Sequence, residues 1–199
     1  MSQAGYSNSF EQFLSDDRSV IVDKLKNYIK DAGDSQVRAW RDSIKVLHNT
    51  IQELKNLSPE ICSQSSIILE YTIPLESRRV DAILLLGDVV LSTEFKGKNM
   101  PLMADIDQAA AYARDLKAYH RDCASSTVKC LLVLSEGFKE HESQTNVEII
   151  GSGRLTQLCM DCIEESSGQI NLDNFLSLES YQPLPSLIKA ARELFSSGT

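Results

Sequence analysis

The sequence predicts an α/β fold, in which helices flank a mixed central β-sheet. Two patterns support this prediction. Apolar residues recur at helical spacing before residue 60 and again from 102 to 120, whereas short apolar runs bounded by turn residues lie between them and after residue 127. The chain has 199 residues, of which 42% are hydrophobic and 24% charged, and these values are typical of a globular domain with a sizeable core.

Residues 1–60 are expected to form an N-terminal pair of helices packed on the core. The segment from Ser9 to Lys30 predicts a first helix, and "AGDS" interrupts it. Ser35 is a candidate N-cap for a second helix, which ends before Pro59. The apolar stripe of that second helix consists of Val37, Trp40, Ile44, Leu47, Ile51 and Leu54.

Residues 61–170 are expected to form the α/β core, and residues 171–199 a C-terminal linker and helix. Gly87-Asp88 predicts a two-residue turn between two of the strands, and Pro74 ends the strand before them. The predicted strands are 67–73, 80–86, 89–95, 128–134 and a short one at 147–150. The predicted core helices are 102–120 and 155–163, and "PLPSLIKAARELF" predicts the last helix.

The cysteine content favours a cytoplasmic protein, and the charge bears on its partners. The net charge of −8 argues against nonspecific nucleic-acid binding through an overall basic surface, although residues 70–121 carry only −1 of it. Five cysteines do not suit a disulfide framework, and Cys159 and Cys162 are interpreted as two helix thiols without partners for zinc. No apolar run approaches the ~20 residues of a membrane span, so no membrane partner is expected.

Three charges lie near the open end of the predicted hairpin. With Gly87 and Asp88 as the turn, Leu86 faces Val89, and the same pairing places Asp81 opposite Glu94. Lys96 shares a strand face with Glu94 because the two are two residues apart.

Facing carboxylates repel each other, and a divalent cation between them would remove the conflict. Mg²⁺ prefers carboxylate oxygens, and a lysine beside it can stabilise charge that develops on an attacked phosphodiester. The alternative is a charged rim in which Arg79 and Lys96 neutralise the acids.

The next helix carries Gln108 and Tyr112 four residues apart, on one face. The apolar stripe of Ile106, Ala110, Ala113 and Leu116 lies roughly opposite, so Gln108 and Tyr112 are not expected on the main core face. A polar pair on a solvated flank would be the simplest explanation of these two residues.

The combination of R-x-D, E-x-K after a hairpin and Q-x-x-x-Y on the next helix resembles the PD-(D/E)xK nuclease superfamily, in particular its RecB-like branch. The resemblance implies a restriction-endonuclease-like core. Most of the chain, including "VRAWRDSIKVL" and "STEFKGK", is also similar to the N-terminal region of bacterial proteins that carry a Schlafen-group-3-like DNA/RNA helicase domain. This sequence has no G-x-x-x-x-G-K-[ST] phosphate loop, which leaves ATP-driven activity in doubt for this chain.

The resemblance implies a role for each site residue. Asp81 and Glu94 would bind Mg²⁺ or Mn²⁺, together with the backbone carbonyl of Phe95, and Lys96 would assist attack by water. Gln108 would orient the water or the lysine. Nucleic acid would be contacted by Tyr112, Arg79 and Lys98. Glu70 would either be a further metal ligand or pair with Arg79.

Three functional hypotheses follow. The first is a Mg²⁺-dependent nuclease that acts on DNA, with RNA left open. The second is a non-catalytic module that binds nucleic acid or docks a helicase domain or subunit, and the third is an interaction domain whose charges are structural. A family context of defence or repair rests on analogy alone, and a homo-oligomer is compatible with all three hypotheses.

Overall fold

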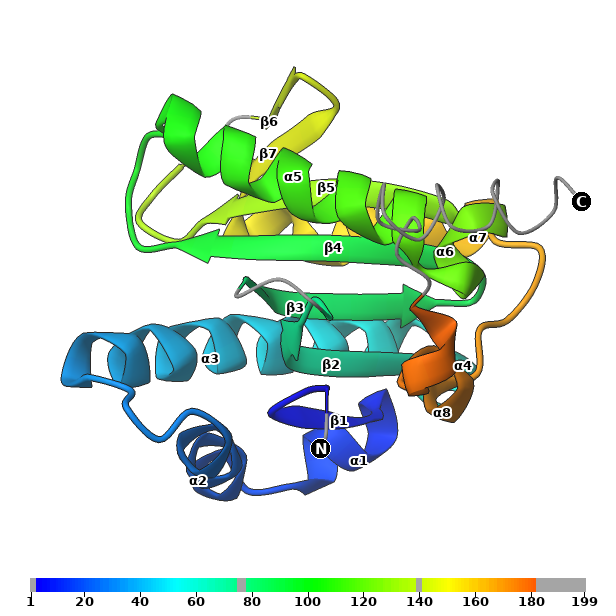
Figure 1. The fold of residues 1–199 in the computed structure, drawn as a ribbon, viewed down its shortest axis with the longest axis horizontal. Coiled ribbons are helices and arrows are strands. Elements are labelled where there is room, and N and C mark those ends of the chain that lie inside the picture. Colours follow the sequence, from blue (N-terminus) through cyan, green and yellow to red (C-terminus); the bar gives the residue numbers. More distant parts are fainter. Residues whose placement is uncertain (1–2, 75–77, 139–140, 182–199) are drawn as a thin grey trace, which may run out of the picture.

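The computed structural model describes residues 3–74, 78–138 and 141–181, and within them it confirms the α/β prediction. Seven strands form one mixed sheet in the order β1-β2-β3-β4-β5-β7-β6 (Figure 1). The strands are β1 (Tyr6–Ser9), β2 (Ser65–Thr72), β3 (Arg79–Leu86), β4 (Val89–Lys96), β5 (Thr127–Leu134), β6 (His141–Gln144) and β7 (Val147–Gly151).

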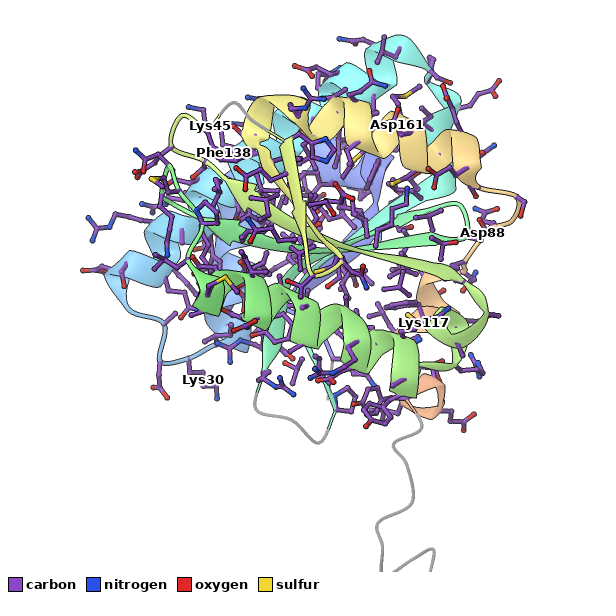
Figure 2. All side chains as sticks on the ribbon, turned by 90° about the horizontal axis from the view of Figure 1, so that it is seen from above. Lys30, Lys45, Asp88, Lys117, Phe138 and Asp161 are labelled. Atoms are coloured by element: carbon purple, nitrogen blue, oxygen red, sulfur yellow. The ribbon has the colours of Figure 1, made fainter. Side chains whose placement is uncertain are left out.

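Helices cover both faces of this sheet. The α-helices are α1 (Phe10–Ser15), α2 (Arg18–Tyr28), α3 (Asp34–Leu57), α4 (Glu60–Gln64), α5 (Met103–Tyr119), α6 (Arg121–Ser125), α7 (Leu155–Glu165) and α8 (Leu172–Phe175). The described residues also include two 3₁₀ turns, η1 (Ser152–Arg154) and η2 (Leu178–Ser180). Apolar side chains of α3 and α7 form one core with the sheet, and those of α5, α6 and α8 contribute to cores on its other face. In Figure 2, Lys117 on α5 and Asp161 on α7 accordingly lie on opposite sides of the sheet.

The sheet combines an antiparallel and a parallel half. Strands β1 to β4 form antiparallel neighbours, and β4, β5 and β7 run parallel to one another. Helix α5 makes the crossover between β4 and β5, as parallel pairing requires. The carboxyl ends of β4, β5 and β7 therefore meet at one edge of the sheet.

Gly87 begins the predicted two-residue turn between β3 and β4 with a φ of +65°, a conformation that favours glycine. Asp88 follows it, and its carboxylate accepts hydrogen bonds from the hydroxyl groups of Ser166 and Ser167. These bonds attach the turn to the segment that follows α7. The turn lies at the end of the hairpin away from Asp81.

The prediction of one helix from Ser9 to Lys30 is wrong. Residues 6–9 form β1 at the edge of the sheet, and two separate helices follow. Each has its own N-cap, because the side chain of Ser9 accepts from the backbone of Gln12 and that of Asp17 accepts from the backbone of Ser19. Extended backbone at Asp16 separates them. The predicted last helix lies outside the described residues.

In strands β2 and β3, the regular alternation of side chains between the two faces of the sheet is broken near the carboxyl end of β2. Leu69 and Ala82 pack in the core beneath α3 and α7. Tyr71, two residues after Leu69, and its strand partner Val80, two residues before Ala82, pack in the core beneath α5. Glu70 lies at the point of change with a φ of +53°, which is rare for a residue with a side chain. Asp81 occupies the corresponding place on β3.

No helix in the described part of the chain is long and apolar enough to cross a membrane.

Candidate active site

The predicted site residues gather at one end of the sheet. Figure 1 shows the end of β4, the start of β3 and the starts of α3 and α5 together at that end, on the left. Asp81 lies near the start of β3, Glu94 and Lys96 lie at the end of β4, and Gln108 lies in the second turn of α5. The topology thus brings three segments together around these four residues.

The predicted hairpin register is observed as far as Ala82, which faces Thr93. The ladder ends at that pair, so Asp81 and Glu94 occupy the first positions beyond it. There the Asp81 carboxylate accepts a hydrogen bond of 2.9 Å from the backbone N–H of Phe95. The strands therefore separate where the two acids lie, and Asp81 fills part of the opening.

Glu94 is a buried acid with one satisfied oxygen. Its side chain is 2% exposed, and its Oε1 accepts from the Lys96 ammonium at 2.9 Å. Its Oε2 is buried without a hydrogen-bond partner among the described residues. Burial raises the Glu94 pKa, and the nearby charge of Lys96 only partly opposes this. A buried acceptor without a partner is costly, and in a native protein it calls for an explanation.

The Asp81 pKa is raised well above its usual range. Burial is the main cause, and the charge of Glu94 is the second. The hydrogen bond from Phe95 lowers the pKa but does not compensate. The two acids therefore interact, as expected for carboxylates that share a site. Positive charge brought between them would favour their ionised forms.

Lys96 and two residues of α5 form a chain of hydrogen bonds. The Lys96 ammonium donates to Gln108 Oε1 at 3.1 Å, and Gln108 Nε2 donates to the Tyr112 hydroxyl at 2.9 Å. Burial alone would lower the Lys96 pKa, but Glu94 outweighs it and the pKa is raised. Lys96 is therefore a cation at neutral pH, held at two points.

The expectation that Tyr112 does not lie on the main core face is wrong. The residue is 5% exposed, and its ring packs in the core beneath α5 with Leu116, so it does lie on the core face. Its hydroxyl nevertheless accepts a hydrogen bond from Gln108, with which it was predicted to share a helix face. The aromatic ring can fill apolar space while its hydroxyl takes a polar partner.

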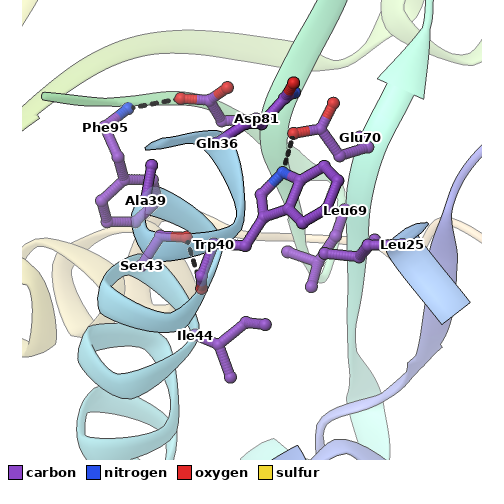
Figure 3. A pocket seen from close by; sticks show the side chains of 10 residues that line it. All are labelled: Leu25, Gln36, Ala39, Trp40, Ser43, Ile44, Leu69, Glu70, Asp81 and Phe95. Carbon is purple, nitrogen blue, oxygen red and sulfur yellow. Dashed lines mark hydrogen bonds between the residues drawn. The ribbon is translucent and has the colours of Figure 1, made fainter. Parts of the chain in front are cut away.

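Both carboxylate oxygens of Glu70 have partners. Oε1 accepts from Trp40 Nε1 at 2.5 Å, and Oε2 accepts from Arg79 Nε at 2.9 Å. Figure 3 shows Glu70 and Asp81 side by side at the top of a cavity of about 80 Å³, with Trp40 below them. Two roles were left open for Glu70, as a metal ligand or as the partner of Arg79, and the structure shows the ion pair with Arg79.

The two basic residues predicted to contact nucleic acid both have acidic partners. Arg79 pairs with Glu70, and Lys98 donates to Asp105 at 2.8 Å. Asp105 also accepts from the backbone N–H of Leu102, so the Lys98–Asp105 pair fixes the loop between β4 and α5. Their contact with nucleic acid stays a prediction.

The donor set around the two acids has the composition that suits Mg²⁺. No group of three or more His, Cys, Asp or Glu side chains converges within the described ranges, so Glu70 does not complete a three-acid site. Mg²⁺ is commonly held by one or two carboxylates, with water and substrate phosphate as its other ligands. Asp81 and the unpartnered oxygen of Glu94 fit that requirement. The predicted role of the Phe95 carbonyl stays a prediction.

Two residues that support the site were not expected from the sequence. Trp40 was assigned only to an apolar stripe, because nothing in a helical repeat shows which indole N–H meets a carboxylate. Asp105 precedes Gln108 by one helical turn, and only the structure shows it paired with Lys98.

Comparisons with protein-family models, with curated proteins and with solved structures found no match for this chain.

Proposed function

We propose that this protein is a metal-dependent nuclease of the PD-(D/E)xK type that hydrolyses phosphodiester bonds, with DNA as the preferred substrate. Asp81 and Glu94 would hold Mg²⁺ or Mn²⁺, and Lys96 would act on the attacking water and on the charge of the transition state. The observation that carries the proposal is the buried, unpartnered Oε2 of Glu94 beside a second acid whose pKa is raised. When ionised, two such groups destabilise a fold unless a cation meets them.

The pattern of hydrogen bonds supports distinct roles for these residues. When bound, a Mg²⁺ ion would polarise the scissile phosphate and lower the pKa of a water ligand. Lys96 is charged at neutral pH, which suits electrostatic stabilisation better than proton abstraction. Gln108 holds the ammonium from the α5 side, so the lysine need not reorganise during the reaction.

The alternative is a module that binds nucleic acid, or docks a helicase, without cleaving. One observation favours a structural role for the charges: Lys96 already contacts Glu94, and Arg79 already contacts Glu70. The Lys96 pair compensates one oxygen of Glu94, and the other oxygen has no partner among the residues that the structure describes. The nuclease proposal therefore accounts for more of the site than the alternative does.

The test is incubation of the purified protein with end-labelled single- and double-stranded DNA and RNA, in Mg²⁺, Mn²⁺ or EDTA. We expect cleavage of at least one substrate with a divalent cation and none with EDTA. Asp81→Asn and Glu94→Gln, purified in parallel, should be inactive, which excludes a contaminating nuclease. Binding of the same substrates without cleavage under every condition would support the non-catalytic module and overturn the nuclease proposal.

A further inference from the structure

A groove adjoins the candidate active site on its α3 side. It has a volume of about 340 Å³, within the range of ~300–1,000 Å³ that is typical of ligand sites. Residues from three separate segments line it, among them Ser35, Arg38, Ser43, Phe95, Gly97 and Ser135. We refer to it as the Arg38 groove.

Two backbone contacts connect the Arg38 groove to the candidate active site. Phe95, which lines the groove, donates its N–H to the Asp81 carboxylate. Ser135, which also lines it, donates its N–H to the Lys96 carbonyl at 3.0 Å and its hydroxyl to the same oxygen at 3.4 Å. The groove is therefore lined by the same end of β4 that carries Lys96 and donates a hydrogen bond to Asp81.

Arg38 is the distinctive residue of this groove. It is exposed and forms no hydrogen bond or ion pair within the part of the chain that the structure describes, unlike Arg79, Lys96 and Lys98. A guanidinium group that has no acidic partner is suited to bidentate contact with a phosphate. The hydroxyl group of Ser35 is a further donor in the same lining, whereas that of Ser43 donates to the Trp40 carbonyl. Asp42 is the acid in the lining.

We infer that the Arg38 groove binds a phosphate of the substrate strand next to the one that is cleaved, with Arg38 as its cationic contact. This inference rests on the proposed nuclease function and adds the path of the strand: from the carboxylates across Phe95 toward the first turns of α3. It also explains how an acidic protein holds a polyanion, because the contact is local and does not require an overall basic surface.

The first test is binding, measured by fluorescence anisotropy of a labelled oligonucleotide that the wild-type protein cleaves. The measurement uses the Lys96→Ala background, so that the substrate stays intact. Arg38→Ala should weaken binding about 10-fold, as expected for the loss of a charged hydrogen bond, and should reduce the slope of log K against log salt by about 1. Asp42→Asn should strengthen binding, because it removes negative charge from the groove.

Arg41→Ala is the matched control. Arg41 is also an exposed arginine of α3, but it lines a different hollow, against α2. Its loss should leave the affinity within about 2-fold of the parent. Equal effects of Arg38→Ala and Arg41→Ala would show that only general charge matters and would overturn the inference.

The second test identifies the phosphate. A series of oligonucleotides, each with one neutral methylphosphonate near the cut, is cleaved by the otherwise wild-type protein and by the Arg38→Ala variant. At one position the neutral linkage should slow the parent but not the variant, because the two changes remove the same contact. If the neutral linkage and Arg38→Ala have independent effects at every position, the inference about the Arg38 groove is overturned and the nuclease proposal is left intact. Absence of any cleavage by the parent would instead overturn the nuclease proposal, and this inference with it.

Discussion

The ionised form of Asp81, which the proposed metal site needs, lowers the stability of the fold. Its pKa in the folded protein lies above the unfolded value, so its protonated form stabilises the fold. That contribution is complete below the unfolded pKa of about 3.9 and is lost as the pH rises through the folded value. The folded protein therefore carries a penalty for the Asp81 charge at neutral pH.

Asp81→Asn should consequently raise the melting temperature at pH 8 in the absence of metal. The amide oxygen can still accept from Phe95, while the repulsion with Glu94 disappears. Each tenfold change in proton affinity corresponds to about 1.4 kcal/mol, which is ~3–6 °C for a chain of this size. The gain should shrink toward zero near pH 4, where the parent is protonated as well. A variant that is less stable than the parent at pH 8 would show that the Asp81 charge is structural.

Lys96 is expected to matter for both rate and stability. Lys96→Ala should lower the cleavage rate by ~10²–10³, the usual effect of removing a group that stabilises transition-state charge. It also leaves Glu94 without its partner, at a cost of about 1–3 kcal/mol when Glu94 is ionised.

The stability loss in Lys96→Ala should grow between pH 5 and pH 8, because the unpaired Glu94 can take up a proton at the lower pH. Thermal melting at both pH values, with the cleavage rate measured on the same samples, checks this. A variant that cleaves at the parental rate would remove Lys96 from the mechanism.

Helix α5 positions Lys96 through Gln108, and Tyr112 positions Gln108. Tyr112→Phe keeps the buried ring and removes only the hydroxyl, so folding should be unaffected. We expect kcat to fall several-fold with little change in KM, because the Tyr112 hydroxyl contacts Gln108, which in turn holds Lys96. Tyr119→Phe on the same helix is the control and should not change kcat. A change in KM alone would indicate direct substrate contact by Tyr112.

The β3–β4 hairpin depends on Gly87. A Cβ added there would lie 1.9 Å from the hydroxyl of Ser166, at a φ of +65°. Gly87→Ala should therefore destabilise the protein by about 1–3 kcal/mol, whereas Gly153→Ala, with open space around it, should have little effect. Denaturant unfolding measures both. Because the turn lies away from Asp81, the folded fraction of Gly87→Ala should keep its rate; if it does not, the turn and the site are coupled.

Across the whole molecule, the sequence was most informative where apolar periodicity was strong. The buried strands β2 to β5 and helices α3 and α5 were predicted within a few residues, and Gly87-Asp88 set the hairpin register that is observed. Strands β1 and β6 were missed because they are short edge strands composed largely of polar residues. Such strands are defined by pairing with a neighbour, which leaves no repeat in their own sequence.

The sequence suggested which residues belong to the candidate site, but not how the backbone and side chains are arranged there. The positive φ of Glu70 and the change of phase at β2 and β3 depend on tertiary packing, and no spacing rule shows them. These features place Asp81 against Phe95 N–H rather than in a simple cross-strand pair with Glu94. The burial of Tyr112 was missed for a similar reason, since its hydroxyl and its ring face different surroundings.

The proposed metal site is tested most directly by the melting temperature of metal-free protein at pH 8, measured with and without Mn²⁺ for the parent and for Glu94→Gln. Ligand at 100 times its Kd stabilises a fold by about 2.7 kcal/mol, and for a chain of this size that is a rise of ~5–10 °C. We expect the parent to show such a rise and Glu94→Gln to show none, because the unpartnered Oε2 is the oxygen that would meet the ion. A parent that does not respond to Mn²⁺, or a variant that responds equally, would contradict the claim that these carboxylates bind a cation.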